Sequence, residues 1–157
     1  MNFISVMPAN LYGLNDNYHP VHSHVIPAFI RRFHEAVQKK EETVTCWGDG
    51  SALREFLYAG DLANLCVFLM NHYSGSETVN GGTGKEITIR ELAGLIAKIT
   101  GFQGKILWDV NKANGTPRKR LDVSKAEKLG WVYKTELEDG LRLAYQDYLN
   151  HPVRAER

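Results

Sequence analysis

The chain has 157 residues, of which 43% are hydrophobic, and a formal net charge of +1. This length and composition suffice for one globular domain with a buried core, and the balanced charge gives no general surface for binding nucleic acid. No run of about 18 apolar residues is present to span a membrane, and the amino terminus lacks the pattern of a secretory signal, so we expect a cytoplasmic protein.

The first part of the chain predicts two strands separated by a helix. Residues 3–7 are apolar and partly β-branched, which predicts a buried strand that ends at Pro8. A chain that starts inside such a strand, with nothing earlier to cover it, is expected to be part of a longer protein. Apolar residues at helical spacing predict an amphipathic helix from Val25 to Val37, and residues 43–47 predict a second strand that ends in the turn 48–50.

The second part of the chain predicts mainly helices, each preceded by polar residues that can cap it. Asp61 is expected to accept hydrogen bonds from the free amides at the start of one helix. Capping-box spacing occurs three times, at Thr88 with Glu91, Ser124 with Glu127, and Thr135 with Glu138. With a further strand predicted at residues 105–109, the pattern indicates a mixed α/β fold.

The glycine cluster at Gly81, Gly82 and Gly84 does not meet the requirements of a nucleotide-binding loop. A Rossmann fingerprint needs a glycine where Ile87 stands, and a phosphate-binding P-loop needs serine or threonine where Glu86 stands. We therefore interpret the cluster as a turn that leads into a helix.

Metal binding is not predicted. His19, His22 and His24 lie close together, but no carboxylate or cysteine accompanies them at ligand spacing, and loop histidines more often contact a ligand or the backbone. Cys46 and Cys66 stand singly, without the spacing of a zinc site or a disulfide scaffold, and we expect both to be reduced thiols.

Two basic stretches are candidates for binding phosphate. Arg54 precedes a predicted helix, where its fork-shaped guanidinium can reach a phosphate through two hydrogen bonds. Residues 116–120 contain three basic side chains after an Asn114-Gly115 turn. Spacing alone leaves both alternatives open at each stretch, a phosphate ligand or a solvated surface.

Several sequence blocks resemble the GDP-L-fucose synthase branch of the extended short-chain dehydrogenase/reductases. Two blocks are specific to that branch, residues 23–28 (Ser-His-Val-Ile-Pro-Ala) and residues 115–119 (Gly-Thr-Pro-Arg-Lys). Blocks shared with other reductases of nucleotide sugars lie at 54–57, 80–84 and 129–131, and the resemblance extends over the whole chain. It departs from the family pattern at Ala9, Leu14, residues 58–60 and Asn114.

The resemblance implies an α/β fold, namely the carboxy-terminal portion of an extended short-chain dehydrogenase/reductase. Residues 1–157 would form a small mixed α/β substrate-binding domain with a remnant of the Rossmann sheet. The family's Tyr-x-x-x-Lys pair and glycine-rich cofactor fingerprint do not occur in this chain. We therefore expect the amino-terminal NADP-binding domain to be absent, the isolated chain to be inactive, and the full-length parent to be a homodimer.

The resemblance also assigns roles in epimerising and reducing GDP-4-keto-6-deoxy-D-mannose to GDP-L-fucose with NADPH. His24 would be one member of the acid–base pair that inverts the carbons beside the ketone, since imidazole exchanges protons near neutral pH. Contacts with NADP are implied for Pro8, Ala9, Asn10, Leu11 and His24. Contacts with the GDP-sugar are implied for Asn10, Arg32, Trp47, Arg54, Lys105 and Arg118.

Two alternatives remain open from the sequence. The chain can belong to another nucleotide-sugar epimerase or dehydratase, which would share Arg54 and the glycine turn without needing His24. It can also be a binding module that holds a nucleotide sugar without chemistry.

Overall fold

The structure is a computed structural model that describes residues 3–151. Its elements in chain order are β1 (Val6–Pro8), β2 (Asn10–Tyr12), α1 (Val25–Lys39), β3 (Thr43–Trp47), β4 (Leu53–Arg54), β5 (Phe56–Tyr58), α2 (Ala59–His72), β6 (Val79–Gly81), β7 (Ile87–Thr88), α3 (Ile89–Thr100), β8 (Lys105–Asp109), β9 (Arg118–Lys119), α4 (Ser124–Lys128) and α5 (Leu137–Asn150). This arrangement confirms the predicted mixed α/β fold and its helical second half.

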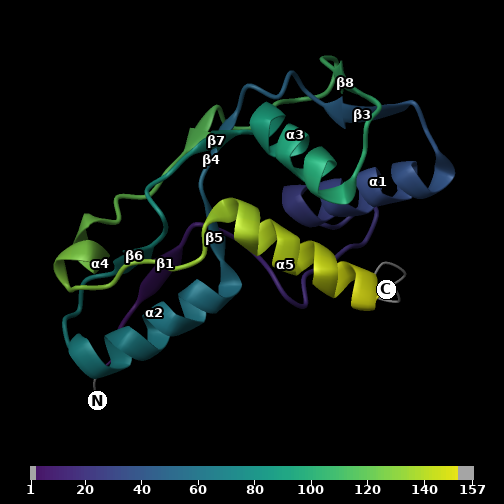
Figure 1. The fold of residues 1–157 in the computed structure, drawn as a ribbon. Coiled ribbons are helices and arrows are strands. Elements are labelled where there is room, and N and C mark those ends of the chain that lie inside the picture. Colours follow the sequence, from purple (N-terminus) through teal and green to yellow (C-terminus); the bar gives the residue numbers. More distant parts are fainter. Residues whose placement is uncertain (1–2, 152–157) are drawn as a thin grey trace.

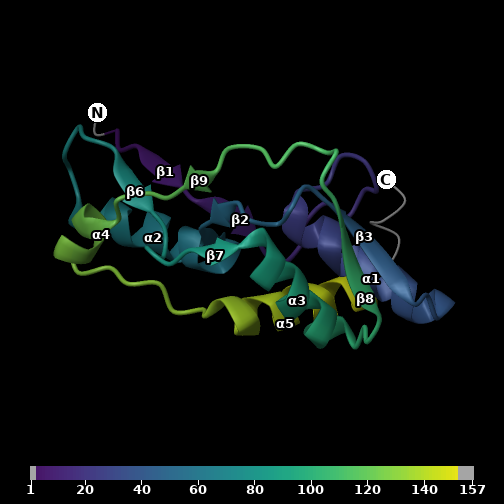
Figure 2. The ribbon, with the colours of Figure 1, turned by 90° about the horizontal axis from the view of Figure 1, so that it is seen from above.

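The molecule is elongated, with different elements at its two ends (Figure 1). One end contains α2, α4, β1 and β6, and the other contains α1, α3, β3 and β8. Helix α5 packs against α3 and belongs to this second group. Among the described residues the strands form four small sheets: the parallel pairs β1–β6, β2–β5 and β3–β8, and the three-stranded sheet β7–β4–β9. Helix α5 runs along the side opposite β1 and β9 (Figure 2).

Helix α1 confirms the prediction from apolar spacing. Ile26, Phe29, Ile30 and Phe33 are buried on one side of the helix, as expected for an amphipathic stripe. The helix ends at Lys40, whose left-handed backbone (φ 55°) lets its amide reach the carbonyls of the last turn. The face of α1 that the sequence predicted is therefore the face that packs into the core.

One of the three predicted capping boxes is confirmed. The Thr88 hydroxyl accepts a hydrogen bond from the Glu91 amide, and the Glu91 carboxylate accepts one from the Thr88 amide, so α3 begins as a capping box requires. The boxes at Ser124 and Thr135 were wrong predictions. Ser124 lies inside α4, and its amide donates to Asp122, while α5 begins only at Leu137.

Asp61 was also predicted wrongly as a helix cap. Helix α2 begins two residues earlier, and its cap residue Tyr58 makes no side-chain capping bond. The buried Asp61 carboxylate instead accepts a hydrogen bond from the Thr135 amide, 2.9 Å away. The carboxylate thus connects α2 to the segment before α5. This long-range hydrogen bond replaces the predicted local bonds to the amides at the start of α2.

The buried apolar side chains form two clusters. The larger cluster joins α1, α3 and α5 with β2 and β3, and includes the fully buried Phe33, Ile96 and Leu141. The smaller cluster lies around α2, β6 and α4, and includes Leu65 and Leu69. None of the helices between residues 3 and 151 is long and apolar enough to cross a membrane.

The strand predicted at residues 3–7 is shorter and less buried than expected. Strand β1 begins at Val6, which packs against the smaller cluster, and it pairs in parallel with β6. Met7, on the opposite face, is 54% exposed, and Phe3 is also exposed. The predicted burial was wrong for this face because no described element covers it.

Candidate functional site

Asn10, His24 and Arg54 line one hollow of about 250 Å³, together with Leu11 and Phe56. Asn10 opens β2, His24 immediately precedes α1, and Arg54 ends β4. These residues are far apart in the sequence, and the parallel pairing of β2 with β5 is what brings Asn10 alongside Phe56. The structure therefore gathers four of the predicted site residues, Asn10, Leu11, His24 and Arg54, around one cavity.

The charge in this hollow is positive and uncompensated. The Arg54 guanidinium donates a hydrogen bond to the carbonyl of Leu53, 2.7 Å away, and within residues 3–151 it forms no ion pair with a carboxylate. The Asn10 side chain donates to the Glu55 carbonyl at 2.7 Å, which fixes its orientation. An oriented amide and an unpaired guanidinium are groups that bind phosphate or hydroxyl oxygens.

His24 is exposed at the edge of this hollow. It is the residue before the first turn of α1, but its side chain makes no capping hydrogen bond, so the imidazole is available to a ligand. Asp16 lies within electrostatic reach of it: burial raises the pKa of the Asp16 carboxyl, and the amide of Asn17 and the charge of His24 partly oppose that rise. His24 thus has a carboxyl neighbour as well as access to the cavity.

The neighbouring histidines have a different role. The rings of His19 and His22 stack with centroids 4.7 Å apart. The His19 Nδ1 atom accepts hydrogen bonds from the amides of Val21 and His22, both at 3.1 Å. His19 therefore stabilises the loop backbone, and in the described part of the chain no three His, Cys, Asp or Glu residues are placed to hold a metal ion.

A second hollow, of about 360 Å³, lies on the other side of Asn10. Pro8 and Ala9 line it from the end of β1, and Lys119 and Arg120 line it from β9 and the residue that follows. This places most of the residues predicted to contact NADP beside two basic side chains. The remaining two, Leu11 and His24, line the first hollow.

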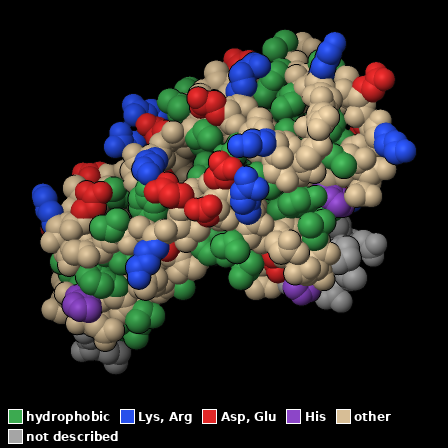
Figure 3. Space-filling model, viewed as in Figure 1, with side chains coloured by type: hydrophobic (Ala, Val, Ile, Leu, Met, Phe, Trp, Pro, Cys, Tyr) green, Lys and Arg blue, Asp and Glu red, His purple; other side chains and the backbone are tan. Residues whose placement is uncertain are grey.

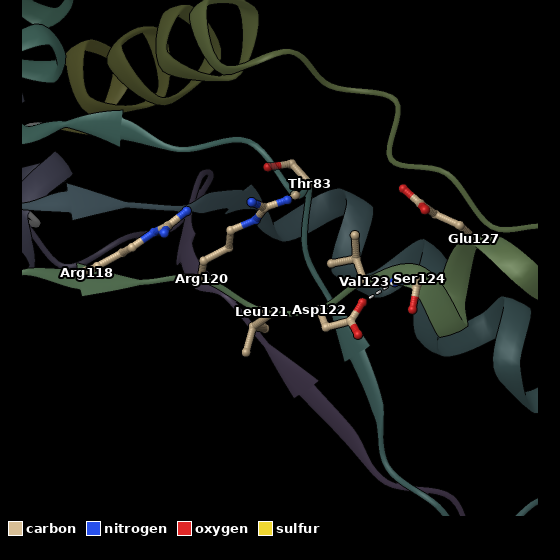
Figure 4. A pocket seen from close by; sticks show the side chains of 9 residues that line it. Thr83, Arg118, Arg120, Leu121, Asp122, Val123, Ser124 and Glu127 are labelled. Carbon is tan, nitrogen blue, oxygen red and sulfur yellow. Dashed lines mark hydrogen bonds between the residues drawn. The ribbon is translucent and has the colours of Figure 1, made fainter.

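A third hollow, of about 770 Å³, separates β9 from α4. In Figure 4 the Arg118 and Arg120 side chains extend along one side, and the Arg120 guanidinium points toward Thr83. Arg118 is already paired with Glu86: its Nε lies 2.8 Å from Oε1 and its Nη2 lies 2.6 Å from Oε2. This contact raises the pKa of Arg118 and lowers the pKa of Glu86, so Arg118 must exchange one anion for another to bind a phosphate.

Three further predicted residues lie away from these hollows. Arg32 donates a hydrogen bond to the Thr45 carbonyl, 2.9 Å away, and lines a separate shallow hollow. Trp47 is 66% exposed at the end of β3, with the Lys112 ammonium 5.6 Å from its ring centroid. Lys105 opens β8 at the other end of the same sheet. Arg32, Trp47 and Lys105 do not line the hollow that contains Arg54, and their contacts with the GDP-sugar stay predictions.

Sequence reasoning missed Glu55, which lies between two residues that line the first hollow. Its side chain is 1% exposed, and its carboxylate accepts hydrogen bonds from three backbone amides. The sequence carries only a weak signal for it, since Glu55 stands directly before the apolar residues Phe56 and Leu57 of β5 but follows the charged Arg54. Lys119 and Arg120 were also not singled out, because a basic loop has no spacing that predicts which side chains face a cavity.

Comparison with known proteins gives a consistent family relationship. Residues 1–82 match the NAD dependent epimerase/dehydratase family. A putative GDP-L-fucose synthase 2 of Arabidopsis thaliana is 56% identical over 150 residues, which are 96% of this chain and 46% of the relative. A GDP-L-fucose synthase of Escherichia coli is 44% identical over 162 residues, covering 98% of this chain and 50% of the relative. The chain thus spans about half the length of these relatives.

Solved structures show the same relationship. A GDP-L-fucose synthetase of Naegleria fowleri bound to NADP superposes with a TM-score of 0.91 at 28% identity, over 99% of this chain and 49% of that structure. A UDP-glucose 4-epimerase of Thermotoga maritima with UDP-glucose superposes with a TM-score of 0.84 at 25% identity, over 97% of this chain and 47% of that structure.

Proposed function

The chain belongs to the NAD dependent epimerase/dehydratase family, and from that premise we propose that it is the substrate-binding part of a GDP-L-fucose synthase. In the longer protein it would bind a GDP-4-keto-6-deoxy sugar while the sugar is epimerised and reduced. The observation that carries the proposal is the convergence of Asn10, His24 and Arg54 on one hollow.

The chemistry of these three residues suits a nucleotide sugar. Arg54 is unpaired among the described residues and would bind the diphosphate through its planar guanidinium. His24, at the edge of the same hollow, would deliver or accept the proton when a ring carbon beside the ketone is inverted. Asn10 would orient the sugar, since its own amide is already held by Glu55.

The branch-specific sequence block around His24 supports a fucose synthase over another epimerase. A different epimerase or dehydratase would use Arg54 in the same way but would not require an imidazole in the hollow. A binding module without chemistry would not require it either. The presence of His24 beside Arg54 therefore favours a fucose synthase over both alternatives.

NADPH, when bound to the longer protein, supplies the hydride for the reduction. Pro8, Ala9, Asn10 and Leu11 would approach the nicotinamide, since the first three line the hollow at the end of β1. Ala9 is held there by a 2.8 Å hydrogen bond from its amide to the Gly81 carbonyl. Parallel α/β sheets bind their ligands at the carboxyl ends of strands, and the end of β1 is such a position.

An amino-terminal cofactor-binding part would also cover the exposed apolar surface of this chain. Met7 on β1 and Val67 and Met70 on α2 are exposed, and apolar side chains come to the surface over α2 in Figure 3. A parallel strand and a helix of this composition are normally buried on both sides. We propose that the whole protein is cytoplasmic and forms a homodimer. Gel filtration of the full-length protein would test the oligomeric state.

Binding of GDP to the isolated chain tests the role of Arg54. We expect weak binding that falls with rising salt, and a loss of about tenfold or more in Arg54→Ala, because charge-assisted hydrogen bonds are lost. Arg142→Ala is the matched control, since Arg142 pairs with Glu138 on the exposed side of α5. Calorimetry would show the difference, and equal GDP affinity in the two variants would contradict the proposal.

Replacement of His24 in the full-length protein tests the epimerisation. His24→Asn should lower the exchange of solvent deuterium into the carbons beside the ketone by roughly a hundred- to ten-thousand-fold, the usual contribution of a positioned acid or base. Reduction should be affected less, because hydride transfer does not pass through His24. Deuterium exchange at the wild-type rate in His24→Asn would contradict the catalytic role of the imidazole.

A further inference from the structure

Glu55 is a buried carboxylate at the centre of the candidate site. Its Oε1 atom accepts hydrogen bonds from the amides of Thr83 and Gly84, at 2.7 and 2.8 Å, and its Oε2 atom accepts one from the amide of Leu121, at 2.9 Å. No lysine or arginine in the described part of the chain forms an ion pair with it. Three amides therefore take the place of a cation in stabilising this carboxylate.

The glycine turn is shaped to receive this side chain. A Cβ atom on Gly82 would lie 2.2 Å from the Glu55 Oε1 atom, far inside contact distance. Only a residue without a side chain lets the backbone approach the carboxylate so closely. The glycine cluster and the Arg-Glu-Phe block, which looked like separate features of the sequence, are thus the two sides of one contact.

Each segment held by Glu55 also contributes to the hollows. Arg54, its neighbour in the chain, lines the first hollow, and Asn10 donates to the Glu55 carbonyl. The glycine turn and Leu121 line the third hollow, and Lys119, two residues before Leu121, lines the second. One buried residue therefore contacts segments that line all three hollows.

We propose that Glu55 is a positioning residue that fastens the glycine turn and the segment after β9 to the strand carrying Arg54, and so sets the geometry of the phosphate-binding site. The inference rests on the proposed function for the identity of the ligand. Glu55 lines the second hollow, but both oxygens of its carboxylate already accept hydrogen bonds from amides and the residue is 1% exposed, so we assign it a positioning role.

Glu55→Gln tests this role with little change of shape. Glutamine keeps one acceptor oxygen but places an NH₂ group against a backbone N–H, so one side of the contact is lost. We expect faster hydrogen exchange at the amides of Thr83, Gly84 or Leu121 and about tenfold weaker binding of GDP to the 157-residue chain. Glu41→Gln is the control, because Glu41 is exposed beyond the end of α1.

A double-mutant cycle separates positioning from general destabilisation. If Glu55 acts through the placement of Arg54, Glu55→Gln should weaken GDP binding much less in an Arg54→Ala background than in the wild type. Equal losses in both backgrounds would overturn the proposal. So would wild-type GDP affinity in Glu55→Gln when the three amides exchange faster.

The same measurements distinguish the two proposals from each other. Suppose that the wild-type chain binds no GDP but Glu55→Gln still speeds hydrogen exchange at the three amides. The nucleotide assignment then fails, and the role of Glu55 in holding these segments is supported. If Glu55→Gln does not fold, the wild-type chain decides: added GDP should slow exchange at Thr83, Gly84 and Leu121 further. Unchanged exchange at all three amides in the presence of bound GDP would then contradict the proposal.

Discussion

The end of the molecule built from α1, α3 and α5 encloses its apolar side chains, whereas the end built from α2, β1 and β6 leaves apolar side chains at the surface. In the first, α3 packs against both α1 and α5, and Phe33 and Ile96 have no exposed area. In the second, Leu65 and Leu69 are buried on one side of α2, while Val67 and Met70 are exposed on the other.

The difference follows from how many faces of each element are apolar. Helix α1 has one apolar face, which is buried against α3 and β3, as expected for an amphipathic helix. Helix α2 is apolar around most of its circumference and needs a cover on each side. The first end buries the apolar face of its helix, and the second leaves Val67 and Met70 exposed, which is the surface that the proposed amino-terminal part would cover.

The largest expected difference between the two ends is in the loss of stability when an apolar side chain is replaced. Phe33→Ala is expected to lower the free energy of unfolding by about 3–5 kcal/mol, because it removes a buried ring and leaves a cavity between α1 and the Phe102 ring. Met70→Gln should change it by no more than about 0.5 kcal/mol, because the side chain is 75% exposed. Urea unfolding followed by circular dichroism measures both, and a large loss in Met70→Gln would mean that this face is already covered.

Two glycines in helices of the end built from α1, α3 and α5 test how tightly that end is packed. Alanine normally stabilises a helix relative to glycine by about 1 kcal/mol, and Gly94→Ala should do so, since a Cβ there meets nothing within 4 Å. Gly140→Ala should instead destabilise by about 1–3 kcal/mol, because its Cβ would lie 2.2 Å from the buried Tyr12 hydroxyl. Thermal unfolding of the two variants measures this, and shifts of the same sign would contradict it.

The smallest expected effect concerns the loop that leads to His24. Burial raises the pKa of Asp16, so its contribution to stability is greatest below its ordinary pKa of 3.8 and is lost as the pH rises through the folded value. Asp16→Asn keeps an acceptor for the Asn17 amide and should stabilise the chain at pH 7 by up to about 0.5 kcal/mol. Unfolding at pH 7 and pH 3 measures the difference, and an equal gain at both pH values would contradict it.

The sequence alone determined α1 and the start of α3, whereas the equally local capping signals at Asp61, Ser124 and Thr135 were wrong. The apolar stripe from Val25 to Val37 predicted α1, and the Thr88–Glu91 box predicted the start of α3, because both depend on residues three or four positions apart. The resemblance to fucose synthases likewise selected Asn10, His24 and Arg54, which the fold brings around one hollow.

Only the tertiary structure decided how distant polar groups pair. Asp61 binds the Thr135 amide in place of capping α2, and Arg118 on β9 pairs with Glu86, 32 residues earlier in the chain. Glu55 reaches the glycine turn and Leu121, at positions 28 and 66 residues away. A buried carboxylate must find donors wherever the fold supplies them, and because these lie on other segments, no local spacing in the sequence identifies them.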